Sequence, residues 1–191
     1  MPKISTSDFR NGLTIIYNDQ LYNIIEFQHV KPGKGPAFVR SKLKGVETGK
    51  IIDKTFRSGE NMDSVRVERH PYQFLYHDGD MYHFMHTETY EQVALPPQQV
   101  DRANFMKESQ HVVLVINADA DKILFTEMPD HVELVITQSD PGIRGDTAQG
   151  ATKPATLETG AVVQVPLFIN EGDKIRVDTR TSNYIERVKS E

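Results

Sequence analysis

The chain has 191 residues, of which 38% are apolar and 26% charged, and its net charge is −5. This composition excludes a disordered protein, and the lack of cysteine excludes disulfides, thiol nucleophiles and cysteine-ligated zinc. No stretch approaches the roughly 20 apolar residues that span a bilayer, and the N-terminus has no apolar signal core, so we expect a cytoplasmic protein that does not contact a membrane.

The first third of the chain predicts short strands in which apolar residues alternate with polar ones. Residues 13–17 and 21–30 fit this pattern, and Asn18-Asp19 between them predicts a tight turn. A further strand is expected at residues 37–44. The turn-rich segment 59–63 then interrupts the pattern and marks a candidate domain boundary.

The middle third continues the alternation. It predicts strands at residues 65–68, 72–76, 81–85, 112–116 and 122–126. Tyr72, Phe74 and Tyr76 are expected on one face of their strand, as core residues. Asp78-Gly79 predicts a two-residue hairpin turn, in which both residues have positive φ.

After this hairpin only residues 98–107 depart from the β pattern. Val100 and Phe105 would lie on the apolar side of a short helix there. The last third returns to strands, which are expected at residues 132–137, 161–165 and 174–179. Between the first two of these strands lies a long loop, residues 142–153, that is rich in glycine and threonine. Such a loop either contacts RNA or serves as a mobile connector.

These elements predict an all-β fold. Short strands with turns about every ten residues are typical of small barrels or sandwiches. Turn-rich breaks at residues 59–63 and 127–130 divide the chain. The expected domains are residues 1–65, 66–128 and 129–191.

Positive charge is concentrated near the N-terminus of this acidic chain. Residues 1–65 carry ten Lys and Arg against seven Asp and Glu, whereas residues 66–128 carry five against ten. Within residues 31–57 the only acids are Glu47 and Asp53. A block of this kind suggests contact with nucleic-acid phosphates, and a solvated strand face with lysines guarding a sheet edge explains it as well.

One loop in the basic block presents a single lysine. Lys34 lies between Gly33 and Gly35, which remove steric bulk, and Pro32 and Pro36 stiffen the chain on either side. No His, Asp or Glu lies nearby in the sequence to act as a base, so any effect of Lys34 would come from its charge and reach rather than from proton transfer. From the residues alone, an ordinary exposed turn lysine is the simpler interpretation.

The sequence carries no familiar enzyme motif. It has no Walker-type phosphate loop, no dinucleotide fingerprint and no nucleophile elbow. Of the seven histidines, His83 and His86 are closest in sequence, but on a strand their odd spacing places them on opposite faces, so they would not chelate one ion. We therefore expect no catalytic residue, no metal site and no cofactor.

Several motifs occur in an order that resembles the bacterial elongation factor P family along the full length of the chain. The segments that carry the resemblance are residues 32–38, 84–85, 87–92, 141–148, 153–156, 159–168, 177–180 and 184–188. The first of them resembles the family's modified-lysine loop, and the next two its middle-domain signature. The remaining segments resemble its third domain and C-terminal end.

The resemblance implies an N-terminal SH3-like (KOW-type) β-barrel and two OB-fold domains, in an L-shaped arrangement like that of tRNA. It implies a translation elongation factor, not an enzyme, that binds the ribosome between the peptidyl-tRNA and exit sites. There the factor would stimulate peptide-bond formation at consecutive prolines. The implied partners are both ribosomal subunits with their RNA, prolyl peptidyl-tRNA, messenger RNA in the exit site and a lysine-modifying enzyme. We expect a monomer.

The resemblance also assigns roles to particular residues. Lys34 matches the family's functional lysine, and it is expected to carry a covalent extension of the β-lysyl type, with Pro32, Gly33, Gly35 and Pro36 supporting it. Residues 145–148 are expected near messenger RNA. The full set of expected RNA or ribosome contacts is Lys31, Arg40, Lys42, Lys44, Arg144, Gly145, Asp146, Thr147, Ala148, Tyr184 and Arg187.

Three alternatives fit the sequence less well. The archaeal and eukaryotic relative, initiation factor five A, has two domains, so the third domain favours the bacterial form. The bacterial elongation factor P-like protein usually lacks this lysine context. A free-standing OB-fold protein that binds single-stranded RNA would need exposed aromatic residues. Tyr72, Phe74 and Tyr76 could serve, but their alternation indicates a core.

Overall fold

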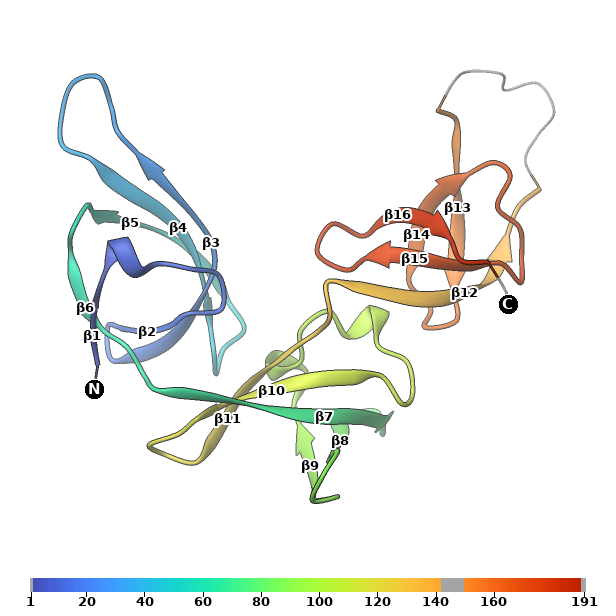
Figure 1. The fold of residues 1–191 in the computed structure, drawn as a ribbon, viewed down its shortest axis with the longest axis horizontal. Coiled ribbons are helices and arrows are strands. Elements are labelled where there is room, and N and C mark those ends of the chain that lie inside the picture. Colours follow the sequence, from blue (N-terminus) through green and yellow to red (C-terminus); the bar gives the residue numbers. More distant parts are fainter. Residues whose placement is uncertain (1, 142–149, 190–191) are drawn as a thin grey trace. The chain divides into compact units, whose positions relative to one another are not determined.

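The computed structural model describes residues 2–141 and 150–189, and every regular element in these ranges is a strand or a three-residue 3-10 helix (Figure 1). The prediction of an all-β fold is therefore confirmed. No helix in the described part of the chain is long and apolar enough to cross a membrane. The chain forms two compact units: the first comprises Met1–Pro71, Leu95–Val100 and Val113–Glu127, and the second Tyr72–Ala94, Asp101–Val112 and Met128–Glu191. The domain limits at residues 65 and 128 stay a prediction.

The N-terminal sheet has four antiparallel strands in the order β2-β3-β4-β5. Their bounds are β2 (Thr14–Tyr17), β3 (Gln20–Val30), β4 (Phe38–Gly45) and β5 (Ile51–Arg57). A two-stranded ribbon of β1 (Lys3–Ser5) and β6 (Asn61–Asp63) is linked to it by a bridge between Ile15 and Ser64. The 3-10 helix η1 (Thr6–Asp8) follows β1 and is capped by the Ser5 side chain.

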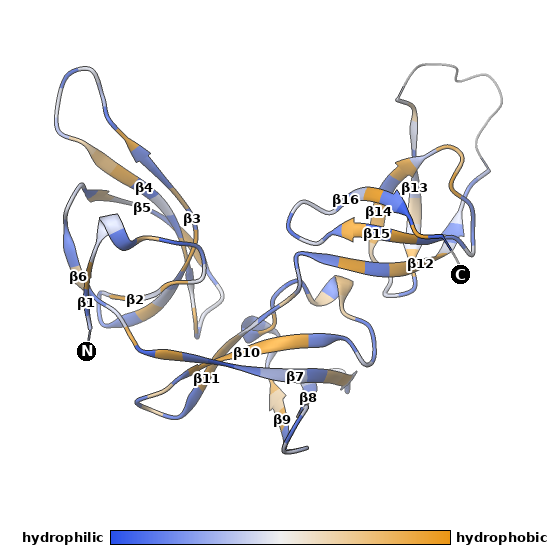
Figure 2. Cartoon of the chain, in the orientation of Figure 1, coloured by the Kyte–Doolittle hydropathy of each residue, from blue (hydrophilic) through white to orange (hydrophobic). Residues whose placement is uncertain are grey.

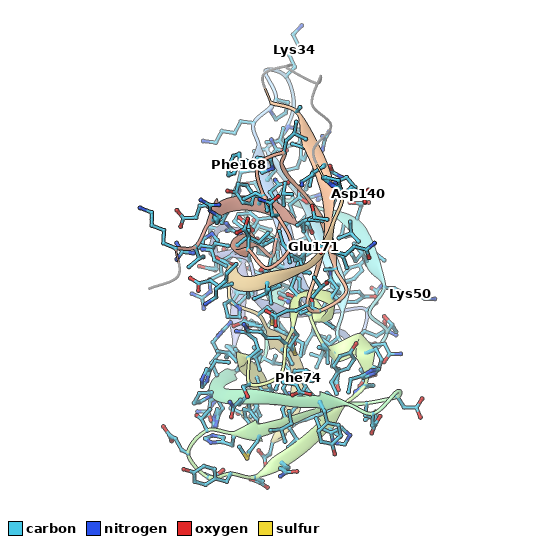
Figure 3. The ribbon with its side chains drawn as sticks, turned by 90° about the vertical axis from the view of Figure 1, so that its right-hand side faces the viewer. Lys34, Lys50, Phe74, Asp140, Phe168 and Glu171 are labelled. Atoms are coloured by element: carbon cyan, nitrogen blue, oxygen red, sulfur yellow. The ribbon has the colours of Figure 1, made fainter. Side chains whose placement is uncertain are left out.

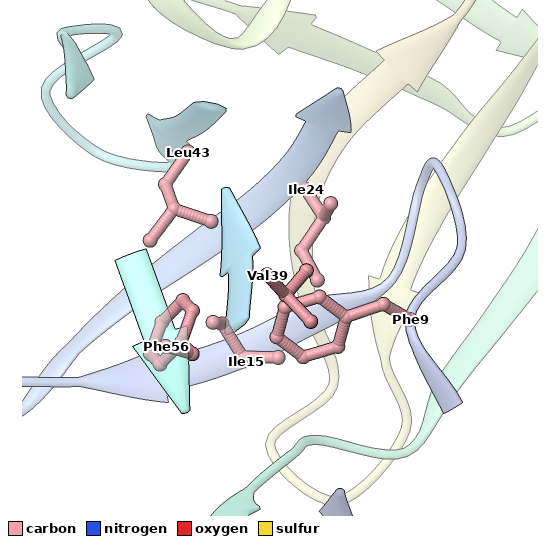
Figure 4. Packing of buried hydrophobic residues seen from close by; sticks show 6 residues of the cluster. All are labelled: Phe9, Ile15, Ile24, Val39, Leu43 and Phe56. Carbon is pink, nitrogen blue, oxygen red and sulfur yellow. The ribbon is translucent and has the colours of Figure 1, made fainter. Parts of the chain in front are cut away.

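Apolar side chains on the inner face of this sheet form one core together with Phe9, which follows η1. Its buried members are Phe9, Ile15, Ile24, Val39, Leu43 and Phe56 (Figure 4). The period of two along β4 produces this segregation, since Val39 and Leu43 point inward while Arg40 and Lys42 are exposed. Figure 2 shows the apolar stretches along β4. Burying one such side chain fully stabilises the fold by about 1.5 to 3 kcal/mol.

A second antiparallel sheet, formed mainly by the middle third of the sequence, has the order β11-β10-β7-β8-β9. The strands are β7 (Val67–His77), β8 (Tyr82–His86), β9 (Gln92–Leu95), β10 (His111–Asn117) and β11 (Lys122–Glu127). Phe84 and Leu114 are fully buried. The sequence predicted a strand in each of these places except β9.

The two predicted hairpin turns differ in outcome. Asn18 and Asp19 have φ of 50° and 60°, so the tight turn between β2 and β3 is confirmed. The β7–β8 hairpin also exists. The prediction that Asp78 and Gly79 both have positive φ was wrong, because of these two residues only Gly79 has a positive φ, of 108°. The loop is four residues long, and the Asp78 carboxylate stabilises it by accepting hydrogen bonds from the Asp80 and Met81 backbone N–H groups.

The prediction that Tyr72, Phe74 and Tyr76 share one buried face was wrong for Tyr76. Phe74 pairs with Phe84, but the next pair is Tyr76 with His83, so Leu75 is an extra residue in a β-bulge. A bulge shifts the alternation by one residue. Tyr72 and Phe74 are buried, whereas Tyr76 is 48% exposed.

The helix predicted at residues 98–107 was also wrong. The segment contains two 3-10 helices, η2 (Pro97–Gln99) and η3 (Ala103–Phe105). Between them Val100 is extended and Arg102 has a left-handed conformation, with φ of 48°. An isolated helix of this length is marginal, and the Arg102 guanidinium is instead held by Asp101 and Thr179, at 2.6 and 2.8 Å.

The C-terminal sheet has the order β14-β13-β12-β15-β16. Its strands are β12 (His131–Ser139), β13 (Thr152–Leu157), β14 (Val162–Pro166), β15 (Lys174–Asp178) and β16 (Asn183–Arg187). The sequence predicted β12, β14 and β15 and missed β13 and β16, as it missed β1, β5 and β6. In β13 the central Pro154 obscures the strand signal, because proline cannot donate to the ladder.

Candidate functional site

The loop that carries Lys34 joins two long paired strands. Residues 31–37 connect β3 to β4, and the last pair before the loop is Val30 with Phe38. Lys34 is exposed, as are both neighbouring glycines, and Figure 3 shows its side chain pointing away from the loop. The structure therefore places the lysine at the exposed end of the β3–β4 hairpin, as predicted from the sequence.

The glycines on either side of Lys34 differ in their roles. Gly35 has φ of 106°, a conformation that side-chain-bearing residues rarely adopt. Gly33 has no such angle, and a Cβ atom added to it would meet no atom within 4 Å. The backbone needs glycine at position 35, whereas position 33 has room for a side chain.

Lys34 has no hydrogen-bond or ion-pair partner among residues 2–141 and 150–189 as the structure describes them. Pro32, which is partly buried, provides the nearest support, since its Cγ would lie 3.9 Å from a Cβ on Gly35. Lys31 and Pro36 are exposed. Lys34 thus presents its amine at the end of the loop without a general base beside it, which suits electrostatic contact or covalent modification rather than proton transfer.

The basic side chains of β4 lie on the outer face of the N-terminal sheet. Arg40 and Lys42 are exposed there, and Lys44 is partly exposed. The Lys42 Nζ donates a hydrogen bond to Glu26 on β3 at 2.9 Å, and this bond raises the pKa of Lys42 above its ordinary value. Glu26 therefore offsets the charge of Lys42, whereas the Arg40 side chain has no ion-pair partner among the described residues.

The Glu26–Lys42 pair was missed at the sequence level. The two residues are directly opposite in the β3–β4 ladder. Counting cross-strand pairs back from Val30 and Phe38 leads to Glu26 and Lys42. This count requires that the ends of the loop are known, and the sequence does not define them. Beyond them the register shifts between Ile24 and Glu26, so counting from the other end of the strands gives the wrong partner.

The remaining expected contact residues lie elsewhere. Tyr184 and Arg187 are on β16 in the second unit, where Tyr184 is half-buried and Arg187 is exposed. An Arg187 Nη1 atom lies 3.9 Å from an Asp173 carboxylate oxygen, so its charge is partly offset. Arg144, Gly145, Asp146, Thr147 and Ala148 lie outside the described residues.

The histidines show separate local roles. The His83 Nε2 atom lies 2.6 Å from an Asp78 carboxylate oxygen. His86 is buried, and its Nδ1 accepts hydrogen bonds from the backbone N–H groups of Glu88 and Thr89. No group of three potential metal ligands occurs in the described part of the chain.

Three family models match consecutive parts of the sequence. They are the elongation factor P KOW-like domain at residues 5–62, the elongation factor P OB domain at residues 67–122 and the C-terminal domain of elongation factor P at residues 132–187. Together they cover most of the chain. Each match lies within one of the three domains expected from the sequence.

Full-length relatives show the same similarity. Elongation factor P of Flavobacterium johnsoniae is 55% identical over 185 residues, which is 97% of this chain and 98% of the relative. Elongation factor P 1 of Porphyromonas gingivalis is 53% identical over the same shares of both chains. Elongation factor P of Pelotomaculum thermopropionicum is 53% identical over 97% of this chain and the whole relative.

Proposed function

The chain belongs to the elongation factor P family and is thus a translation factor; from this premise we propose that it uses Lys34 to stimulate peptide-bond formation at consecutive prolines. The proposed place of action is the ribosome, between the peptidyl-tRNA and exit sites. The single observation that carries the proposal is the exposed amine of Lys34 at the end of the β3–β4 hairpin, which has no partner among the residues that the structure describes.

The physical basis of this role is positioning. Proline constrains the nascent chain through its fixed φ, which makes a productive geometry at the peptidyl-transferase centre rare. A cation that hydrogen-bonds RNA at the acceptor end of prolyl-tRNA orders the substrate and so lowers the entropic part of the barrier. The ribosome performs the chemistry, and the factor contributes no general base.

The modification of Lys34 is part of the proposal. A β-lysyl-type group, attached by a partner enzyme, would lengthen the side chain and keep a terminal amine. The exposure of Lys31, Gly33, Lys34 and Gly35 gives such an enzyme access to the loop without unfolding the barrel. Arginine at position 34 would keep the charge but lacks the primary amine on which the extension is built.

The other proposed contacts serve binding. Basic residues of the first unit, Lys31, Arg40 and Lys44, would face ribosomal RNA or tRNA phosphates, which makes binding salt-dependent. The segment 144–148 would contact messenger RNA in the exit site, and Tyr184 and Arg187 the ribosome. We propose a cytoplasmic monomer that touches both subunits. Replacing Asp146 and Thr147 by alanine should weaken the rescue of proline stalls while the melting temperature stays unchanged.

The test of the Lys34 proposal is a reconstituted translation assay. It uses protein from the native host, after its intact mass has established whether Lys34 is modified, and a message with three consecutive prolines. Lys34→Ala and Lys34→Arg should both abolish rescue, whereas a message without prolines should be translated equally by all variants. Because Lys34 is exposed, the alanine variant should lose less than about 0.5 kcal/mol of stability. Normal rescue by folded Lys34→Ala would refute the proposal.

A further inference from the structure

The β7–β8 hairpin presents an aromatic side chain that the strand pattern alone would bury. The bulge at Leu75 turns Tyr76 onto the outer face, while Tyr72 and Phe74 remain in the core. Bulges are common where a side chain is redirected toward a functional surface. The Tyr76 hydroxyl makes no hydrogen bond to any residue that the structure describes.

The exposed ring rests on a fixed support. The Tyr76 and His83 rings are stacked, with centroids 4.4 Å apart and planes 16° from parallel. His83 is in turn held by Asp78 at 2.6 Å, and Asp78 is fixed by two backbone N–H groups of the turn. We call Tyr76 and His83 together the stacking platform. A ligand that contacts it meets a side chain already ordered, so little conformational entropy is lost on binding.

The segment that carries the platform is acidic. Residues 72–94 contain four carboxylates, at Asp78, Asp80, Glu88 and Glu91, and no lysine or arginine. Asp80 lies in the exposed turn of the same hairpin, and its carboxylate has no partner in the described part of the chain. Such a surface repels the phosphates of single-stranded RNA, although an aromatic ring alone would stack on a base.

A guanidinium group fits both features. It stacks on the face of an aromatic ring and donates paired hydrogen bonds to a carboxylate. A lysine ammonium is a more strongly hydrated point charge without the planar fork, and it fits the platform less well. Charge and geometry therefore favour arginine.

We propose that the stacking platform of Tyr76 and His83, together with the Asp80 carboxylate, is a docking site for an arginine side chain in a basic protein segment. The site lies in the second unit and Lys34 in the first. The proposal goes beyond the role of Lys34 and does not depend on it. A peptide titration of the isolated factor tests it without translation.

The experiment uses the full chain labelled with nitrogen-15 and carbon-13, and hexa-arginine as the probe. We expect the peptide to shift the resonances of Tyr76, Asp80 and His83, and to bind about fivefold more tightly than hexa-lysine. Tyr76→Ala should weaken hexa-arginine binding by about fivefold, and Tyr76→Phe should retain it, since the ring remains.

Tyr90→Ala provides the matched control. Tyr90 is 69% exposed and lies in the same acidic segment, but it is not part of the platform. Its substitution should leave the affinity unchanged, and the amide spectra of all variants should remain those of folded protein. Equal affinity of Tyr76→Ala and the unchanged chain would overturn the proposal, as would shifts confined to other residues. Shifts of the platform by an oligouridine but not by hexa-arginine would show that the site takes a base instead.

Discussion

At the scale of single residues, the two glycines beside Lys34 give a matched pair of substitutions. Gly35→Ala forces a φ of 106° on a residue with a Cβ atom, a strain on the order of 1 to 3 kcal/mol that the loop must absorb or relieve by changing shape. Gly33→Ala meets open space and no unusual angle. We expect Gly35→Ala to lower proline-stall rescue and Gly33→Ala to preserve it.

The measurement is the rescue assay together with thermal melting of both variants. A loss of rescue in Gly35→Ala with an unchanged melting temperature would locate the effect in the loop conformation. Equal activity of both variants would show that the loop shape seen here is not required for function.

A second residue-level prediction concerns pH. The Arg180 guanidinium and two backbone N–H groups hold the pKa of Asp178 well below its ordinary value. A carboxyl group with a lowered folded-state pKa contributes stability that is fully present above its unfolded pKa, near 3.9, and is lost as the pH falls below it. Asp178→Asn should therefore destabilise the protein at pH 7, and the difference should shrink below about pH 4.

Urea unfolding at a series of pH values checks this expectation. Asp121→Asn is the control, because Asp121 is exposed and has no hydrogen-bond or ion-pair partner in the described residues. It should follow the unchanged chain at every pH. A deficit of Asp178→Asn that is constant from pH 7 to pH 3 would contradict the assigned pKa shift.

At the scale of elements, the outer face of β4 carries basic residues, one of which, Lys42, forms an ion pair with Glu26. Glu26→Gln removes the carboxylate that pairs with Lys42. The pair is exposed, so its loss should hardly change stability. The freed lysine should strengthen ribosome binding by about twofold at low salt and steepen its salt dependence.

Binding measured at several salt concentrations tests this prediction. Glu108→Gln removes the same charge from an exposed position outside the N-terminal sheet and serves as the control. A similar gain in both variants would indicate a general charge effect. An unchanged affinity of Glu26→Gln would exclude the outer face of β4 from the interface.

The bulge in β7 predicts unequal costs for two neighbouring aromatic residues. Phe74→Ala empties a core position, 5% exposed, and should cost about 3 to 5 kcal/mol. Tyr76→Ala removes an outward ring and should cost about 1 kcal/mol or less. Equilibrium unfolding in urea measures both. Comparable losses would mean that Tyr76 packs in the core, as the uninterrupted alternation predicted.

These elements show what the sequence can and cannot predict. The positions of β2, β3, β4, β7, β10 and β12 follow from alternation, because each buries one face in a local core. The bulge at Leu75 does not, since the same residues fit an unbroken strand equally well. The break in the middle of the 98–107 segment depends on Arg102 reaching Thr179, a contact between residues far apart in the sequence. The glycines and prolines around Lys34 are a local signal that predicts an exposed loop, whereas the role expected of Lys34 came from the family resemblance.

At the scale of the whole molecule, a small apolar cluster connects the N-terminal sheet to the central one. Val46, which follows β4, packs with Val115, Leu124 and Phe125 of β10 and β11, all within the first unit. Local cores can be predicted from strand patterns, but this cluster cannot, because Val46 lies in a turn. The cluster links the stability of two regions that the sequence assigns to different domains.

Val46→Ala should therefore loosen both regions together. Removing two buried methyl groups costs on the order of 1.5 kcal/mol. Hydrogen exchange should speed up in β4 and β5 and also in β10 and β11. Ile25→Val, a change of similar chemistry at a partly exposed position of β3, is the comparison. Faster exchange confined to β4 and β5 would show that the two regions open independently.

The exposed loop at the end of the β3–β4 hairpin also determines how trypsin cuts the chain. Trypsin cleaves after lysine and arginine, but not when proline follows, so the Lys31–Pro32 bond is protected. The Lys34–Gly35 bond is then the one tryptic site between Arg10 and Arg40. An acyl group on the Lys34 amine removes this site. Unmodified protein therefore releases residues 11–34, and modified protein releases residues 11–40 as one peptide. Digestion followed by mass measurement thus reads the occupancy of the modification directly.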